Sequence, residues 1–553
     1  MKNALYLHRL VGGVTADPEK TTEDPWVRPS EWLEMPTLNL GEQKFVGLHA
    51  VFNNDSNFCS VVVYGGNCTI NWGDGTIENF NQYAFCNHRY VYANIGENTL
   101  TSYGYKQVIV TITPQSGQTI TGYQLNGRSN EVSSLYNYSS GWLDIRIVGS
   151  NVNIIGLMGS NNYNNMLRHF SFKGPNNITS GSSLFKDCLG LECISEFDFS
   201  KFTTFASMFE NCRNLKHLPP LNSTIVTSFS GTFRSCSSLR YIPAISTSNV
   251  TTFSGTFSYC SSLLYVPTIN AENAITIQSM FTNCYLIRNI TIHTSSLCSN
   301  FSSAFSGCYL LKSVTGLDTS SGTDFSHMFR YCNNIELPTL DTHNGINFSS
   351  MFENVLSIID APSLDLSKGT LFDSMFMNCH NLKSIPAYNI GSSVNAGAAV
   401  YCSNMFFCCF ALKNIGNINT TRVTNMSSMF YNCFSLSSIN TVFDTSATTN
   451  MAYMFYQCGT LAELPYFNTS LVTTFSSIFY NCNTLSKAVF QGTKETISYA
   501  NCRLSKQAIV DIFNGLASGV TGKTITISGN WGTQYLTQTD RDIAINKGWT
   551  ISG

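Results

Sequence analysis

The chain has 553 residues, which is too long for one compact core and enough for roughly two to four domains. Its 31 Lys and Arg against 33 Asp and Glu give a net charge of −2, so bulk electrostatics point to no nucleic-acid partner and no anionic-membrane partner. Only 12% of residues are charged while 43% are hydrophobic, which excludes wholesale disorder and predicts a neutral polar surface around a full core. No stretch approaches the ~20 consecutive apolar residues of a membrane-spanning helix, so membrane insertion is not expected.

Residues 1–44 are predicted to form an N-terminal docking arm. The segment PWVRPSEWLEMP contains prolines that interrupt any regular element. The apolar run at 4–7 is shorter than the ~7–15 residues of a signal-peptide core. We therefore expect an extended segment that docks on another surface.

Residues 45–114 show the alternation of a small β-sandwich. The segments TINWGDGT (69–76), HRY (88–90) and KQVIVTITP (106–114) read as strands and a turn, with Trp72 in the core. Gly73, Asp74 and Gly75 would form the tight turn, and calcium binding by Asp74 is the alternative to that role. The WGDG turn, the H-x-Y and the following strand resemble PKD domains, which implies an Ig-like sandwich found in extracellular binding proteins. An insert at 91–105 departs from that pattern.

Residues 115–184 are the least regular part of the chain. LDIRIV (143–148) and LRHFSF (167–172) read as strands about one repeat apart. We interpret this transition as degenerate first coils of a repeat array.

Residues 185–502 repeat with a period of about 24 residues, which is the signature of a solenoid. A cysteine follows the repeated phenylalanine by three residues in every repeat but one, where Val355 stands instead, so we expect buried volume rather than thiol chemistry at this position. Asp or Asn often follows the phenylalanine by thirteen residues and is expected to cap its own turn. The thirteen ladder phenylalanines are Phe185, Phe209, Phe233, Phe257, Phe281, Phe305, Phe329, Phe352, Phe376, Phe406, Phe430, Phe455 and Phe479.

The repeat unit, roughly TxFSxMFxxCxxLxxIPxxNTSxVT, is clear in VTNMSSMFYNCFSLSSI (423–439). It resembles the BspA-like and mycoplasma-lipoprotein class of leucine-rich repeats from about residue 180 onward. That resemblance implies stacked coils, and adhesion or display on bacterial surfaces and phage particles.

Residues 503–553 leave the period and are predicted to form a small α+β cap. LSKQAIVDIFNGLA (504–517) reads as a helix capped by Ser505, and KTITISG (523–529) as a strand. Thr537 and Asp540 form a capping-box pattern, and WTISG reads as a last strand.

No catalytic, cofactor-binding or metal-ligating residue is predicted, and the chain is expected not to be an enzyme. GVTGKT (519–524) lacks the first glycine of a phosphate-binding loop, because Ala517 stands there, and a helix rather than a strand precedes it. Cys402, Cys408 and Cys409 lie close in sequence, which leaves a metal or disulfide as an alternative to packing. The sequons at Asn249 and Asn425 follow from the repeat consensus.

A candidate binding stripe follows the ladder. The residue after the ladder phenylalanine is aromatic in four late coils: Phe407, Tyr431, Tyr456 and Tyr480. Such rings suit glycan or protein recognition, and the alternative is that they only cover the core. An insertion near 391–400 lies in the same region.

The expected fold is mainly β: a PKD/Ig-like sandwich, a leucine-rich-repeat solenoid of about thirteen 24-residue repeats, and the α+β cap. An arm, a WGDG sandwich and these repeats resemble phage virion proteins, so we expect a structural protein on the virion surface, assembled in the host cytoplasm. The favoured role is a tail fibre or receptor-binding protein, with virion proteins as partners of the N-terminal part and a host surface glycan or protein as partner of the solenoid. A capsid or tail decoration protein and a bacterial surface adhesin are the alternatives. A homo-oligomer is compatible with the sequence, although no heptad run requires one.

Overall fold

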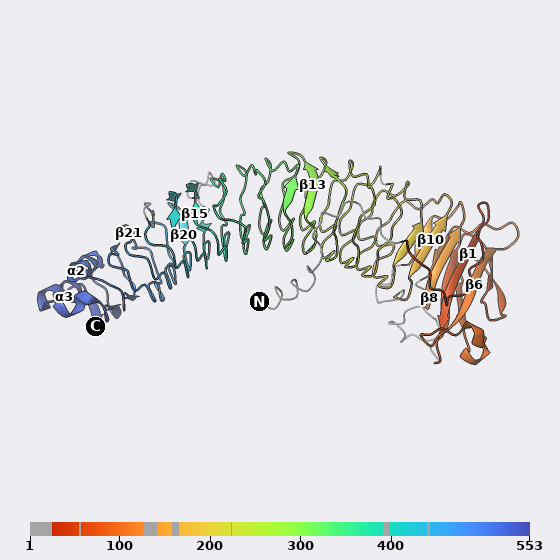
Figure 1. The fold of residues 1–553 in the computed structure, drawn as a ribbon, viewed down its shortest axis with the longest axis horizontal. Coiled ribbons are helices and arrows are strands. Elements are labelled where there is room, and N and C mark those ends of the chain that lie inside the picture. Colours follow the sequence, from red (N-terminus) through yellow and green to blue (C-terminus); the bar gives the residue numbers. More distant parts are fainter. Residues whose placement is uncertain are drawn as a thin grey trace.

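The computed structural model describes residues 25–54, 57–125, 141–157, 165–222, 224–390, 398–439 and 443–553. The described chain is a curved rod with a two-sheet sandwich at one end, stacked coils along its length and a small cap at the other end (Figure 1). The fold is mainly β, as the repeat pattern predicted. Within these ranges no helix is long and apolar enough to cross a membrane.

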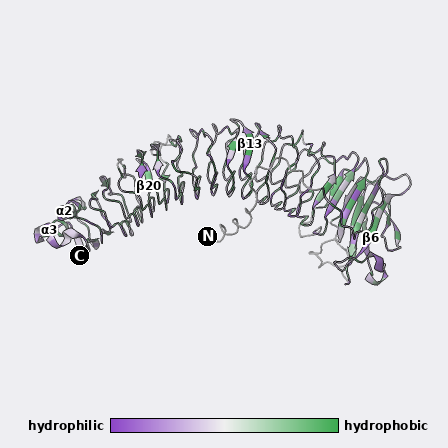
Figure 2. Ribbon diagram, viewed as in Figure 1, coloured by the Kyte–Doolittle hydropathy of each residue, from purple (hydrophilic) through white to green (hydrophobic). Residues whose placement is uncertain are grey.

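The N-terminal sandwich packs a seven-stranded sheet against a four-stranded sheet. The large sheet has the order β11 (Cys193–Glu196), β10 (His169–Lys173), β8 (Trp142–Val148), β1 (Lys44–Val51), β6 (Lys106–Pro114), β3 (Cys68–Asn71) and β4 (Ile77–Phe80). The small sheet has the order β5 (Phe85–Arg89), β2 (Phe58–Tyr64), β7 (Gly122–Gln124) and β9 (Ile154–Gly156), and the 3-10 turns η1 (Tyr92–Asn94) and η2 (Glu97–Thr99) precede β6. Figure 2 shows apolar and polar residues together on the sandwich strands, and Trp72 and Trp142 lie fully buried in the core.

The sandwich does not end at residue 114, because β7, β8 and β9 all come from the stretch 115–184. Strand β8 pairs antiparallel with β1 and parallel with β10, whose residues lie 25 positions later, as in the pair Asp144 and His169. The strands predicted at 143–148 and 167–172 therefore lie side by side like successive coils. One continuous sheet carries the chain from the sandwich into the solenoid.

The coils of the solenoid are built mostly from turns. The residues two before and two after each ladder phenylalanine have positive φ, for example 53° at Ser207 and 65° at Asn211. This left-handed conformation interrupts a strand. Successive coils are still joined by backbone hydrogen bonds and isolated parallel bridges, such as Thr252 with Thr276.

Regular strands occur in a few coils of the solenoid. They form the parallel groups β12 (Ile269–Ala271), β13 (Asn289–Thr294) and β14 (Ser313–Thr315); β15 (Ser384–Ile385) and β18 (Asn414–Ile415); β16 (Tyr388–Asn389) and β19 (Ile418–Asn419); β17 (Val400–Tyr401) and β20 (Val423–Asn425); and β21 (Phe467–Asn468) and β22 (Phe490–Gln491).

The interior of the solenoid is a set of stacked rows. Ladder rings lie face to face, with centroids 5.4 Å apart between Phe209 and Phe233. The Cys236 thiol donates to the carbonyl of Phe209 at 3.1 Å, and the same bond recurs in most coils with a ladder cysteine. All twenty cysteines are free and buried, so burial was predicted correctly, whereas the hydrogen bond was not foreseen. Val355 fills its slot without that bond, so volume is the shared requirement.

The predicted Asx caps are confirmed. Asp198 Oδ1 accepts from the Ser200 N–H at 2.9 Å, and Asn468 Oδ1 accepts from the Ser470 N–H at 3.1 Å. The buried threonine beside the cap links the coils, since Thr469 Oγ1 donates to the Gln491 carbonyl at 3.0 Å. The recurrent Asn-Thr-Ser sequence thus has a structural origin.

The C-terminal cap has the predicted elements. Helix α2 (Lys506–Gly515) begins after Ser505, whose side chain accepts from Ala508, and α3 (Gln538–Ile545) begins with a capping box between Thr537 and Asp540. Strands β23 (Ile497–Ser498), β24 (Lys523–Thr526) and β25 (Trp549–Ser552) form a parallel sheet, with the 3-10 turn η3 (Trp531–Tyr535) between β24 and α3. The cap covers the last coil and removes its open edge.

Candidate functional site

The four residues of the predicted stripe form one continuous stack. Ring centroids lie 4.5 Å apart between Phe407 and Tyr431, 4.4 Å between Tyr431 and Tyr456, and 4.8 Å between Tyr456 and Tyr480. The planes are within 12° of parallel, and Tyr480 at the end is 53% exposed. The sequence thus placed these side chains together correctly.

The stacking limits what this stripe can bind. A sugar ring packs its C–H groups on the electron-rich face of an aromatic ring, and in this stack the inner faces are covered by neighbouring rings. Edges and hydroxyl groups remain, together with the outer face of Tyr480. Burial and the neighbouring Tyr456 raise the pKa of Tyr431, which keeps its phenol a neutral donor and acceptor. The stripe offers a row of hydroxyls with one open ring at its end.

A second aromatic row in the late coils was missed by the sequence analysis. His380 stacks on Phe410 at 4.5 Å, and Phe410 stacks on Phe434 at 5.3 Å. These residues follow the ladder phenylalanine by four positions, so the repeat alignment already contained the signal. The insertion at 391–400 falls partly outside the described residues, since 391–397 are not among them.

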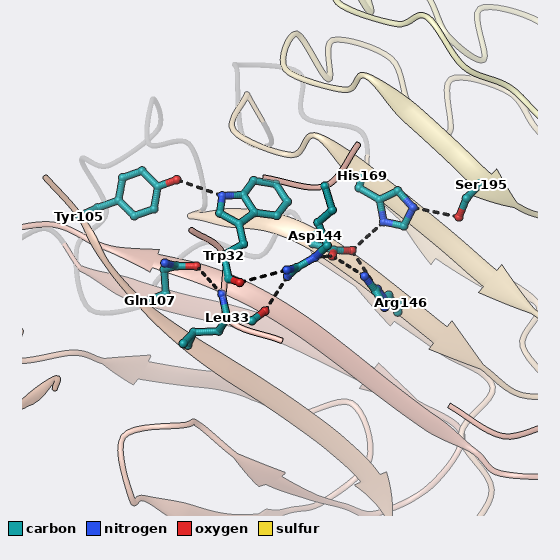
Figure 3. A network of polar contacts seen from close by, with 9 residues as sticks. Trp32, Leu33, Tyr105, Gln107, Asp144, Arg146, His169 and Ser195 are labelled. Carbon is teal, nitrogen blue, oxygen red and sulfur yellow. Dashed lines mark hydrogen bonds and ion pairs between the residues drawn. The ribbon is translucent and has the colours of Figure 1, made fainter. Parts of the chain in front are cut away.

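A polar network joins the sandwich to the first coil (Figure 3). The buried carboxylate of Asp144 lies 3.0 Å from Arg28 Nε, 3.0 Å from Arg146 and 2.7 Å from His169 Nδ1. A carboxylate only accepts, so Nδ1 of His169 carries a proton that it donates to Asp144, and Nε2 of the same ring lies 2.9 Å from Ser195 Oγ. Although burial opposes ionisation, the hydrogen bond and charge of His169, with Arg146, lower the pKa of Asp144 to about 2.

Ser195, His169 and Asp144 therefore have the connectivity of a serine-hydrolase triad, and no sequence motif indicated it. Ser195 is the extra residue of a β-bulge, because Phe170 pairs with Ile194 and Ser171 with Glu196. It lies within strand β11, whereas serine nucleophiles commonly sit on a strand-to-helix turn beside backbone N–H donors.

The same network holds the arm against the sheet. Trp26 stacks on the His169 ring at 4.6 Å and donates to Glu192 at 3.3 Å. The Arg28 guanidinium also donates to the carbonyls of Trp32 and Leu33. The described part of the arm, 25–43, thus docks on its own sandwich through contacts that use the Asp144 group.

The WGDG turn has a structural role. Asp74 Oδ1 accepts from the Thr76 N–H at 3.0 Å, and its Oδ2 lies 2.7 Å from His88 Nε2. The His88 ring stacks on Trp72 with centroids 5.0 Å apart. Gly73 and Gly75 have positive φ, as a tight turn requires. These contacts favour the turn role of Asp74 over the calcium alternative.

The other candidate residues are held by structural contacts. Lys523 is part of β24 and pairs with Glu495 at 2.5 Å, so the GVTGKT segment is a turn and a strand. Cys402, Cys408 and Cys409 are buried, and burial raises the pKa of each thiol. In the part of the chain that the structure describes, no group of three or more His, Cys, Asp or Glu residues is placed to hold a metal ion.

The stacked 24-residue coils define the class as a leucine-rich-repeat-like solenoid protein. The chain belongs to the family described as "Mycoplasma protein of unknown function, DUF285", whose family model matches residues 179–294, 299–404 and 400–502. No curated protein matches the sequence.

Several solved structures are similar to this chain at low identity. A leucine-rich repeat protein from Eubacterium ventriosum is 15% identical, with 62% of this chain and 84% of that chain covered and a TM-score of 0.28. The TLR13–ssRNA13 complex gives 13% identity, coverage of 73% and 68%, and a TM-score of 0.22. The Toll–Spatzle complex of Drosophila gives 15% identity, coverage of 66% and 47%, and a TM-score of 0.21.

Proposed function

We propose that the chain is a non-enzymatic attachment protein on the surface of a phage virion. The N-terminal arm and PKD-like sandwich bind other virion proteins, and the solenoid reaches outward to a host surface glycan or protein. The observation that carries this proposal is the asymmetry of the rod, because the sandwich and the late coils lie toward opposite ends (Figure 1). The aromatic stack belongs to these late coils, at residues 407–480.

The buried thiols support assembly in the host cytoplasm. Twenty free cysteines in one chain suit a reducing compartment, since stacked thiols in an oxidising one risk mispairing. The small share of charged residues, 12%, and the neutral polar surface suit a structural protein that is displayed on a particle.

The non-enzymatic assignment is supported by what surrounds the Ser195–His169–Asp144 group. The Asp144 carboxylate is shared with Arg28 and Arg146, and Trp26 covers one face of the histidine ring. These contacts anchor the arm, so they give each member of the Ser195–His169–Asp144 group a structural role.

Competition for adsorption tests the attachment role. Purified full-length protein is added to the cells on which the particles grow, and the particle adsorption rate is then measured. Protein that is bound to the cells occupies receptors, so the adsorption rate should fall as more protein is added. An unchanged rate at saturating protein would contradict attachment and favour a decoration protein.

Matched variants show what the stripe contributes. Tyr480→Ala removes the open ring at the end of the stack, and Tyr466→Ala removes a 59% exposed tyrosine outside it. If the stack contacts the receptor, only Tyr480→Ala weakens the competition. If both variants compete as well as the unaltered protein, the stack only covers the core and does not contact the receptor.

A further inference from the structure

One position of the repeat collects basic side chains. It follows the ladder phenylalanine by seven residues, and backbone hydrogen bonds align it from coil to coil, as from the Lys312 N–H to the Arg288 carbonyl at 2.7 Å and from the Lys413 N–H to the Lys383 carbonyl at 3.0 Å. Of the 31 Lys and Arg in the chain, six lie at this position, and Arg168 extends the row by one coil because its carbonyl accepts from the Glu192 N–H at 2.8 Å. We name these seven residues the basic row: Arg168, Lys216, Arg240, Arg288, Lys312, Lys383 and Lys413.

The row is a surface feature that also contains two carboxylates. Lys216, Arg240, Lys312, Lys383 and Lys413 are exposed. Two carboxylates share the row: Glu192, 3.8 Å from Arg168, and Glu336, 3.6 Å from Lys312. The carboxylates at Asp198, Asp318 and Asp365 lie instead in the Asx turns, six residues further along each coil. In a chain of net charge −2, this segregation creates a local positive stripe.

Aromatic and polar groups adjoin the basic row at two coils. Tyr241 and Tyr265 occupy the next repeat position and are joined by a parallel bridge, and Arg240 lies over the Tyr241 ring at 5.8 Å. Tyr265, Arg288 and Asn289 line a hollow of about 250 Å³ together with Thr268 and Thr291. This is slightly below the roughly 300–1,000 Å³ of pockets for drug-sized ligands, which suits a single sugar ring.

The chemistry of the hollow matches a carboxylated sugar. A guanidinium recognises a carboxylate, a partly exposed tyrosine packs against C–H groups, and amide and hydroxyl groups bond sugar hydroxyls. A nucleic acid fits less well, because single strands need an aromatic platform for successive bases. Beyond Tyr241 and Tyr265 the adjoining positions carry no further Phe, Tyr or Trp ring; they include Asn289, Ser313 and Ser384, and also Leu337, Asp360 and Glu463.

We propose that the basic row binds a linear acidic polysaccharide laid along the solenoid axis, with one carboxylated sugar in the hollow at Tyr265 and Arg288. The proposal rests on the attachment function above and deepens it, since it assigns the ligand class and the surface. The carboxylates of the polysaccharide lie along the cations of the basic row. Glu336 weakens the contact locally because it repels them.

Binding of the full-length protein to polygalacturonate tests the proposal, with fully methyl-esterified polygalacturonate as the uncharged control polymer. We expect binding to the acid form that weakens steeply with salt, and no binding to the ester. The double variant Arg240→Gln/Arg288→Gln should weaken binding by about tenfold or more, since two charge-assisted contacts are lost. Arg234→Gln, at an exposed position outside the row, is the matched control and should bind like wild type.

Two further variants sharpen the location of the site. Tyr265→Ala should weaken binding, whereas Tyr259→Ala, a 47% exposed tyrosine elsewhere on the same coil, should not. Glu336→Gln removes an opposing charge and should tighten binding about twofold to fivefold. Thermal unfolding of each variant confirms that the fold is retained.

Equal binding by the row variants and their controls would overturn the proposal, as would preferred binding of a single-stranded oligonucleotide. If polygalacturonate binds through the row but the protein is absent from particles, the ligand assignment stands and the virion role fails. If the protein competes for adsorption but binds no acidic polymer, the attachment role stands and this assignment fails.

Discussion

The sandwich and the solenoid bury different kinds of groups. The sandwich encloses the titratable side chains of His49, Lys106, Asp144 and His169, each at most 4% exposed. Among the described residues of the solenoid, Glu353 is the one buried charged side chain, and it pairs with Arg330 at 2.8 Å. Otherwise the interior there consists of apolar rings, aliphatics, thiols and hydroxyls. The sandwich depends on specific charged contacts, whereas the solenoid depends on neutral rows repeated coil after coil.

This difference predicts how the stability of the two parts responds to substitutions and to acid. A solenoid coil contacts its neighbours, so its stability is nearly a sum of local terms that pH hardly changes. The sandwich relies on individual groups whose protonation matters. Four expectations follow from this contrast.

The largest effect is expected inside the ladder. Phe305 is fully buried between Phe281 and Phe329, and Phe305→Ala should cost about 3–5 kcal/mol because it removes the ring and leaves a cavity. Denaturant unfolding measures the loss. Phe434→Ala, at a 44% exposed ring, is the matched control and should cost less than about 1 kcal/mol. Similar losses for both variants would contradict the ladder as the main source of stability.

Acid should destabilise the sandwich before the solenoid. Burial lowers the pKa of His49 from 6.5 to about 3. Between these two pH values the histidine is protonated in the unfolded chain and neutral in the folded chain. The neutral histidine therefore leaves the free energy of unfolding unchanged above pH 6.5. As the pH falls below 6.5, the free energy of unfolding decreases, by roughly 3 kcal/mol at about pH 4. Asp144, with a pKa of about 2 against its ordinary 3.8, adds a further loss from about pH 4 to pH 2.

Hydrogen exchange along the chain, corrected for intrinsic rates, measures this order. Peptides from 44–114 should lose protection at a higher pH than peptides from 185–502. His49→Gln should flatten the pH dependence above about pH 4, while His343→Gln, at a 46% exposed side chain, should not. Loss of protection in the solenoid first would reverse the comparison.

The aromatic stack should contribute modestly to stability. Tyr456→Ala removes two ring contacts and should cost about 1–2 kcal/mol, whereas Tyr456→Phe keeps the stack and should cost less than about 0.5 kcal/mol. Thermal unfolding compares the two. A large loss in the Phe variant would mean that the hydroxyl, rather than the stacking, stabilises these coils.

The smallest effect is expected at the thiol row. Cys332→Val copies the natural Val355 of the next coil and gives up only the bond to the Phe305 carbonyl at 3.1 Å, so it should cost less than about 1 kcal/mol. Denaturant unfolding under reducing conditions checks this value. A cost near that of Phe305→Ala would show that the thiol bond, not its volume, is required.

Much of the solenoid was predictable because its pattern repeats. Thirteen copies made the phenylalanine, cysteine and Asx positions unmistakable, and the caps at Ser505 and Thr537 follow local rules that hold in the structure. The aromatic stack followed from the same alignment. Most of the basic row is visible in the same alignment, because six of the thirteen residues seven after the ladder phenylalanine are Lys or Arg.

The rest needed three-dimensional information. The left-handed residues at Ser207 and Asn211 are hidden because serine and asparagine also suit ordinary turns. The extension of the sandwich past 114 depends on short strands, such as β7, that carry little pattern. Asp144, His169 and Ser195 lie 25 and 26 residues apart and meet only because successive parallel strands align them.

Immunogold electron microscopy tests the attachment role most directly. Antibodies against the solenoid are applied to producing cells and to released particles. If the proposed attachment role is right, we expect label on tails or vertices of the particles. Uniform label over heads would favour decoration, and label on intact uninfected cells with none on particles would contradict the virion role and favour a bacterial adhesin.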